Sequence, residues 1–182
     1  MAIGMTDKPL HVLLTGASRG IGKAIELALI DRGARVVALS SADGDLANPT
    51  VPSTLWRAAL ETLDGRIDAL VNNAGVFEAN PLDAGEAQWL DNWEHTMAIN
   101  LTAAAQFCRH AVLHMQEQGG GRILNIASRA AHRGDSPAHW HYAASKGGMV
   151  SMTKTIARAY AAQHIYAFVA WAPVKRAILR RG

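Results

Sequence analysis

LHVLLTGASRGIG, residues 10–22, places a short apolar run directly in front of three closely spaced glycines. The run Leu10–Leu14 is continuously apolar, as in a strand buried on both faces, and Ile21–Asp31 has a helical pattern that ends before Gly33. The glycines therefore lie where a strand turns into a helix, a position where glycine permits a tight turn and close approach of a ligand. The amide groups that begin such a helix favour a phosphate. We predict a strand, a phosphate-binding turn and a helix.

Short apolar runs alternate with longer helical patterns along the rest of the chain. Further strands are expected at residues 35–39, 67–71, 122–127 and 165–171, and further helices at residues 53–63, 87–118 and 139–163. This alternation is typical of parallel strands joined by crossover helices. The sequence therefore predicts an α/β fold, a doubly wound parallel sheet in a three-layer α/β/α arrangement, with one domain over residues 1–182.

The composition is that of a globular protein and argues against several kinds of partner. The chain has 182 residues, is 49% hydrophobic and 18% charged, and carries a net charge of +3. Much of that excess lies in a basic tail, residues 174–182, so we expect no nucleic-acid partner. No apolar run reaches about 18 residues, so we expect no membrane partner. Cys108 is the single cysteine and cannot form an internal disulfide, which favours a cytoplasmic location.

A second informative stretch is YAASK, residues 142–146. Tyr142 and Lys146 stand four residues apart, so both lie on one face of the expected helix. An ammonium group beside a phenol favours the phenolate, so the tyrosine can exchange a proton near neutral pH. The hydroxyl of Ser128, if brought near, can hold a carbonyl or alcohol oxygen. Together with a turn that binds a hydride-carrying dinucleotide, these residues predict a carbonyl/alcohol oxidoreductase.

The end of the second expected strand indicates which dinucleotide is preferred. An NAD enzyme usually has an Asp or Glu there, which binds the ribose hydroxyls. This chain has Ser40 and Ser41 instead, and Arg19 in the glycine turn supplies a cation. We therefore predict NADP as the cofactor, with NAD as the alternative if Arg19 is an ordinary exposed loop residue.

Five motifs occur in an order that matches one protein family. They are TGxxxGxG at residues 15–22, NNAG at residues 72–75, Asn100, Ser128, and YxxxK at residues 142–146. Each motif is modest alone, but the combination resembles the short-chain dehydrogenase/reductases over about residues 10–173. The resemblance implies a Rossmann-like fold and a mechanism that transfers a hydride and a proton.

The resemblance implies four catalytic residues. Tyr142 would be the general acid in reduction and the general base in oxidation, and Lys146 would favour its phenolate form and hold the nicotinamide ribose. Ser128 would hydrogen-bond the substrate oxygen, and Asn100 would anchor a water relay to the lysine. The substrate would be a small carbonyl compound or secondary alcohol, and Phe77 and Trp140 are expected to shape its pocket.

The resemblance also implies which residues contact the cofactor. Those after the third expected strand would line the ribose path, and Asp45 and Leu46 would touch the adenine. The full set expected to bind the cofactor is Thr15, Gly16, Ser18, Arg19, Gly20, Ile21, Gly22, Ser40, Ser41, Asp45, Leu46, Asn73, Ala74, Gly75, Tyr142, Lys146 and Pro173. No metal site is expected, because His132, His139 and His141 have no i, i+4 ligand pair and no carboxylate partner.

Two parts of the family pattern are missing from this chain. Between Ser40 and Ile67 there is room for one helix and a short strand near Asp43–Leu46, so the usual helix after the second strand is expected to be absent. After Pro173 the family has a loop, two helices and a final strand, and we expect the final strand and its preceding helix to be absent. One face of the sheet would then be covered by the helix Ile21–Asp31 alone.

Two functional interpretations follow. The first is an NADP(H)-preferring short-chain oxidoreductase that interconverts a small carbonyl and a secondary alcohol, and that forms a homo-oligomer through the long helices near residues 87–118 and 139–163. The alternative is a truncated, catalytically impaired homologue that binds a dinucleotide or a protein partner without turnover.

Overall fold

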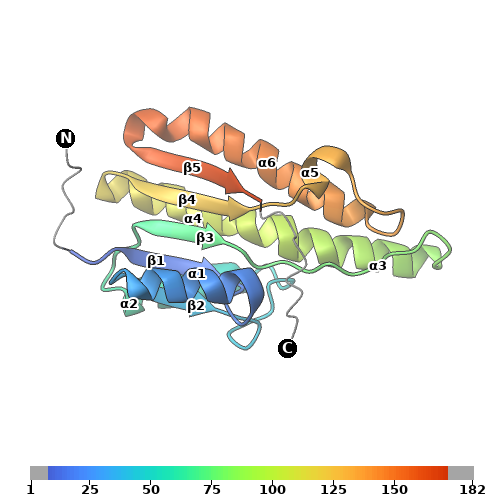
Figure 1. The fold of residues 1–182 in the computed structure, drawn as a ribbon, viewed down its shortest axis with the longest axis horizontal. Coiled ribbons are helices and arrows are strands. Elements are labelled where there is room, and N and C mark those ends of the chain that lie inside the picture. The colour runs from blue at the N-terminus through green and yellow to red at the C-terminus, as the bar shows by residue number, and fades with distance from the viewer. Residues whose placement is uncertain (1–7, 172–182) are drawn as a thin grey trace, which may run out of the picture.

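A single parallel sheet organises the chain. The computed structural model describes residues 8–171, and its five strands lie in the order β2-β1-β3-β4-β5 (Figure 1). The strands are β1 (His11–Thr15), β2 (Arg35–Leu39), β3 (Ala69–Asn72), β4 (Gly121–Ile126) and β5 (Ile165–Ala170). All neighbours pair in parallel; Leu13, for example, lies opposite Val37 on one side and Leu70 on the other. The predicted parallel α/β fold is confirmed.

Helices cross over on both faces of this sheet, which makes it doubly wound. They are α1 (Gly20–Asp31), α2 (Val51–Thr62), α3 (Glu86–Met97), α4 (Ala103–Gln118), α5 (Ala130–Arg133) and α6 (Trp140–Tyr160), with a π-helical segment η1 (Ala98–Thr102) and a 3₁₀ turn η2 (Ala161–Gln163). In Figure 1, α1 lies in front of the sheet, whereas α2, α4 and α6 lie behind it. The element ends differ from the predicted ones by about three residues or fewer, the usual uncertainty at helix and strand ends.

The larger hydrophobic core lies between the sheet and helices α2, α4 and α6. Phe107 and Met115 of α4 are buried against Leu70 of β3 and Ile123 of β4. Trp56 of α2 closes one end of this core and stacks on the His110 ring of α4 at 5.8 Å between ring centres. This side of the sheet is therefore fully covered.

The opposite face is covered only in part. Helix α1 packs on Val12 and Val71 of the first and third strands. Leu124 of β4 lies on this face too, and its partner in register is Phe168 of β5, which is 53% exposed. Within residues 8–171, no helix lies over this part of the sheet, as expected from the two missing parts of the family pattern.

One predicted element is more complex than the sequence indicates. The apolar pattern predicts one regular helix over residues 87–118, but the structure has α3, the π-helical segment and α4 in succession. A π-helical turn inserts a residue, and such insertions are frequent at functional sites. The predicted helical span is confirmed, but the π-helical turn within it was not predicted, because apolar periodicity does not reveal a single inserted residue.

The loops also differ from prediction at two places. The short strand expected near Asp43–Leu46 does not form; this segment makes turns, with the Asp43 amide donating to Ser40 O at 3.2 Å. A carboxylate that bonds the backbone locally competes with strand pairing, which explains the difference. The loop expected after β4 contains the short helix α5.

The uncovered face leads to a first prediction. Because Tyr166 and Phe168 expose aromatic surface beside each other on β5, the chain should bind a fluorescent dye specific for apolar surface. Replacing both by threonine, which suits a strand, should reduce dye fluorescence and shift the thermal midpoint by only a few degrees. As a contrast, Phe107→Ala in the buried core should lower the free energy of unfolding by about 3–5 kcal/mol. Absence of dye binding by the unmodified chain would contradict this interpretation of the surface.

Candidate cofactor and active site

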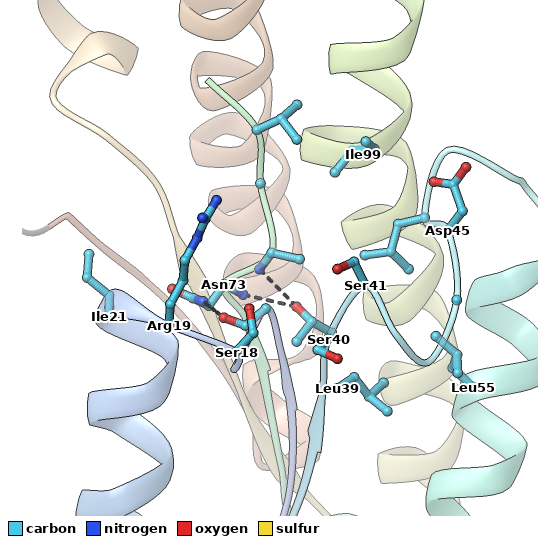
Figure 2. A pocket seen from close by; sticks show the side chains of 17 residues that line it. Ser18, Arg19, Ile21, Leu39, Ser40, Ser41, Asp45, Leu55, Asn73 and Ile99 are labelled. Carbon is cyan, nitrogen blue, oxygen red and sulfur yellow. Dashed lines mark hydrogen bonds between the residues drawn. The ribbon is translucent and has the colours of Figure 1, made fainter. Parts of the chain in front are cut away.

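A cavity of about 420 Å³ opens at the carboxyl ends of β1, β2 and β3 (Figure 2). Strand order reverses between β1 and β3, and ligands of parallel α/β sheets bind at such switch points. Many residues predicted to bind the cofactor line this cavity: Thr15, Gly16, Ser18, Arg19, Ile21, Ser40, Ser41, Asp45, Leu46, Asn73, Ala74 and Gly75. The structure thus gathers three separate sequence segments around one cavity.

The glycine turn is tied directly to the loop after β3. Thr15 Oγ1 accepts hydrogen bonds from the backbone amides of Asn73 and Ala74, each at 3.1 Å. In return, Asn73 Nδ2 donates to Gly16 O at 2.8 Å. The dashed lines in Figure 2 mark these bonds. They fix the backbone on both sides of the strand-order reversal.

Two of the glycines are required by close packing. Gly16 has φ +70°, and a Cβ there would lie 2.6 Å from the Cα of Ala74. A Cβ on Gly22 would lie 2.1 Å from Gly16 O and 2.5 Å from Asn73 Nδ2. Any larger residue would push the first turn of α1 away from the turn it supports, so the glycine spacing is a steric requirement of this site.

The loop after β2 holds an acidic group that the sequence analysis did not place there. Ser40 donates two hydrogen bonds to Asp43 Oδ2, from its backbone N at 2.7 Å and from its Oγ at 2.9 Å. The expectation that this strand end has no acid is therefore wrong, because a turn returns the carboxylate from three residues further along.

Lys146 is buried next to Tyr142 on α6. Its Nζ lies 5.9 Å from the centre of the Tyr142 ring and donates a hydrogen bond to Ile126 O at 3.0 Å. The lysine is 4% exposed, and this burial lowers the pKa of its ammonium group to about 8. The group therefore remains mainly charged at neutral pH, and the predicted pairing on one helix face is present.

Asn100, in the π-helical segment, lies near Lys146. It is fully buried, and its amide bonds both backbone groups of Val76, accepting from N at 2.8 Å and donating to O at 3.0 Å. It also donates to Ser145 Oγ at 3.4 Å. A Cβ on Gly75 would lie 3.1 Å from Asn100 Oδ1 and 3.4 Å from Lys146 Nζ. Gly75 thus lies directly beside both side chains and at the edge of the cavity.

Ser128 precedes the short helix α5, and three aromatic rings meet near the start of α6. Ser128 Oγ accepts from the Ala130 amide at 3.2 Å, at the start of the short helix α5. Phe77 packs edge-on against the Tyr142 ring, with 4.7 Å between centres, and stacks on the ring of His139 at 4.0 Å. Phe77 and Trp140, both expected to shape a substrate pocket, are 56% and 54% exposed, and the ring that stacks on Phe77 is that of His139.

The remaining predicted cofactor residues are not among those found to line the cavity. Gly20, Gly22, Tyr142 and Lys146 do not line the cavity, and Pro173 lies outside the residues that the structure describes. Five further residues line the cavity that the sequence motifs did not predict: Leu39, Gly44, Leu55, Val76 and Ile99. Val76 and Ile99 directly adjoin motif residues, which could have indicated them; Leu55 comes from α2, and only the packing of that helix reveals it.

Two features were not found in the part of the chain that the structure describes. Within residues 8–171, no three His, Cys, Asp or Glu side chains come together in a way that could hold a metal ion. No helix within the same range is long and apolar enough to cross a membrane.

Comparison with known proteins identifies the family. The family model described as short chain dehydrogenase matches residues 41–174. The chain is 34% identical to "Short chain dehydrogenase adrF" of Penicillium roqueforti, over 82% of this chain and 63% of that protein. It is 33% identical to "3-oxoacyl-[acyl-carrier-protein] reductase FabG" of Vibrio harveyi, over 84% of this chain and 68% of that protein. This chain belongs to the short-chain dehydrogenase family.

A solved structure agrees with this assignment. The crystal structure of a putative short-chain alcohol dehydrogenase from Sinorhizobium meliloti 1021 is similar with a TM-score of 0.73 and 31% sequence identity. The match covers 88% of this chain and 70% of that one. The chain therefore spans between about three fifths and seven tenths of the length of these relatives.

The close packing at Gly22 leads to a second prediction. Gly22→Ala should lower both the thermal midpoint and the affinity for a dinucleotide, because the added methyl group overlaps Gly16 O. Overpacking of this kind lowers the free energy of unfolding by about 1–3 kcal/mol. Gly85→Ala is the matched control, since nothing lies within 4 Å of its Cβ. Calorimetric melting and nucleotide titration of both variants would test this; equal behaviour of the two would show that the turn tolerates a side chain.

Proposed function

We propose that this chain carries the active site of an NADP(H)-preferring oxidoreductase that interconverts a small carbonyl compound and a secondary alcohol. The observation that supports this most is the position of Gly75, which lines the cavity and lies beside both Asn100 and Lys146. A ligand that fills the cavity along the glycine turn would therefore reach the Tyr142/Lys146 pair. Family membership supports the same chemistry.

The residues present fit a dinucleotide. The glycine turn presents bare backbone at the start of α1, where helix amides favour a phosphate. Ser18 and Arg19 lie on one side of the cavity and Ser41 and Asp45 on the other, at positions suited to an adenosine (Figure 2). When bound, the nicotinamide cofactor supplies or accepts the hydride.

Tyr142 would handle the proton. In the reducing direction its phenol donates a proton to the carbonyl oxygen as negative charge develops there. The ammonium group of Lys146, held by Ile126 O, stabilises the resulting phenolate. The hydroxyl of Ser128 would donate a hydrogen bond to the same substrate oxygen. In the oxidising direction the phenolate takes the proton back.

Asn100 would position the residues around this chemistry. Its two hydrogen bonds with Val76 hold the loop that follows Gly75, and its contact with Ser145 connects that loop to α6. The loop therefore stays in register with Lys146, one residue further along the helix. A relay of protons from the lysine to solvent would start here.

A second candidate is a family member that binds a dinucleotide or a protein partner without turnover. The observation that favours it is the exposed apolar surface at Tyr166 and Phe168, which is suited to an association. Nucleotide binding by the unmodified chain without detectable hydride transfer would support this second function.

We also propose how copies of the chain associate and where in the cell the protein is located. Copies of the chain would associate through α4 and α6; Leu113 on α4, 47% exposed, supports an outward apolar contact. A cytoplasmic location is supported by Cys108, the single cysteine of the sequence, which is a buried free thiol.

The role of Tyr142 leads to a third prediction. Tyr142→Phe should lower the rate of NADPH-dependent carbonyl reduction by about 10²–10⁴-fold, because only the proton donor is lost. Cofactor affinity should change little, as measured by NADPH fluorescence. Tyr166→Phe removes the same hydroxyl from an exposed strand position and should leave the rate unchanged. An unaltered rate in Tyr142→Phe would disprove the proposed mechanism.

The cofactor choice leads to a fourth prediction. Fluorescence titration should show tighter binding of NADPH than of NADH, and Arg19→Ala should remove the difference. A charged hydrogen bond to a phosphate contributes about 1.5–3 kcal/mol, so NADPH affinity should fall at least about tenfold. Arg158→Ala, on the exposed side of α6, is the control for loss of a positive charge. Tighter NADH binding by the unmodified chain would refute the preference.

A further inference from the structure

The end of β2 has two hydrogen-bond donors, and one carboxylate engages both. Asp43 Oδ2 accepts from the backbone N and from the Oγ of Ser40. The turn is closed further by the Asp43 amide, which donates to Ser40 O at 3.2 Å, and by the Ala42 amide, which donates to Ser40 Oγ at 3.2 Å. Ser40 is therefore held in place by its own loop.

This arrangement places a negative charge immediately behind the wall of the cavity. Ser40, Ser41 and Gly44 line the cavity, whereas Asp43 does not. Its Oδ2 is nevertheless only 2.7 Å from Ser40 N. The opposite side of the cavity has Arg19, which makes no ion pair with any carboxylate within residues 8–171. The adenosine end of the cavity thus has a positive charge on one side and a negative charge on the other.

We propose that Asp43, acting through Ser40, restricts binding of the 2′-phosphate and so sets how strongly this protein distinguishes NADP(H) from NAD(H). The inference rests on the proposed function, because it assigns the adenosine end of the same site. A 2′-phosphate needs donors, and the two donors of Ser40 are engaged by a group of like charge. A ribose 2′-hydroxyl carries no charge and has no such conflict.

Arg19 and Asp43 therefore act in opposite directions on the same ligand group. Arg19 attracts a 2′-phosphate, and Asp43 repels it and withholds the Ser40 donors. Asp43 is a specificity residue for the cofactor, and it lies three positions beyond the one at which an acid usually marks an NAD enzyme.

Adenosine 2′,5′-bisphosphate and AMP test this directly, because they differ only in the 2′-phosphate and need no hydride transfer. Calorimetric titration of the full 182-residue chain should show Asp43→Asn binding the bisphosphate about tenfold more tightly, the scale of removing one nearby like charge. AMP affinity should change by less than about twofold. Asp31→Asn, at the end of α1, changes the net charge equally and should alter neither affinity.

A second variant tests the part played by Ser40. In the unmodified chain Ser40→Ala should have little effect on the bisphosphate, because the hydroxyl is engaged by Asp43. In the Asp43→Ala background, where position 43 has no side-chain acceptor, the same change should remove part of the gain, since the released hydroxyl would then bind the phosphate. This non-additivity is the mark of two residues acting together. Thermal melting without ligand would show that each variant is folded, and Asp43→Ala provides a second removal of the charge.

Each outcome decides the matter. Tightening of the bisphosphate alone supports the proposal. If the Asp43→Asn variant binds both nucleotides more tightly to the same extent, or if neither affinity changes, the proposal is overturned while the proposed function stays intact. If no variant binds either nucleotide, both proposals fail. If the Asp43 effect is present but the chain transfers no hydride, only the proposed oxidoreductase activity fails.

Discussion

The close contact between the glycine turn and the loop after β3 is the constraint on which the site depends. Gly16 and Gly22 leave no room for a side chain between them and Ala74 or Asn73, and Thr15 accepts two amides from the same loop. Because the backbones touch, the first turn of α1 and the ends of β1 and β3 form one rigid unit. The cavity proposed to bind a dinucleotide is formed at the surface of that unit.

A second rigid unit holds the residues proposed for proton transfer, and it is joined to the first through four consecutive residues. The loop Asn73–Val76 begins with the bonds to Thr15 and ends with the amide of Asn100 bound to Val76. The π-helical segment places Asn100 in that position, and Gly75 lets the loop pass close to Lys146. Hydride and proton transfer must occur at the same substrate carbon–oxygen bond, and this short connection keeps the two units at a fixed distance.

The two faces of the sheet differ in how they support this site. Helices α2, α4 and α6 cover one face with a continuous core, and the residues of the proton chemistry come from that side. Helix α1 covers the other face near β1 and leaves Phe168 of β5 exposed. Within residues 8–171, Tyr142 and Lys146 therefore lie on the better-packed side, whereas the glycine turn begins the helix on the other side; the exposed Phe168 is not among the residues that line the cavity.

The order of residues along the chain was enough to predict the parallel α/β fold, the glycine turn, and the pairing of Tyr142 with Lys146. These depend on local patterns: apolar runs for buried strands, glycine where a side chain would overlap, and a spacing of four residues on one helix face. It did not determine the π-helical insertion, the contribution of Leu55 from α2, or the return of Asp43 onto Ser40. Those features arise from packing and from hydrogen bonds that depend on the path of the chain in space. A carboxylate three residues away is near or far according to the turn between, and only the tertiary structure decides which.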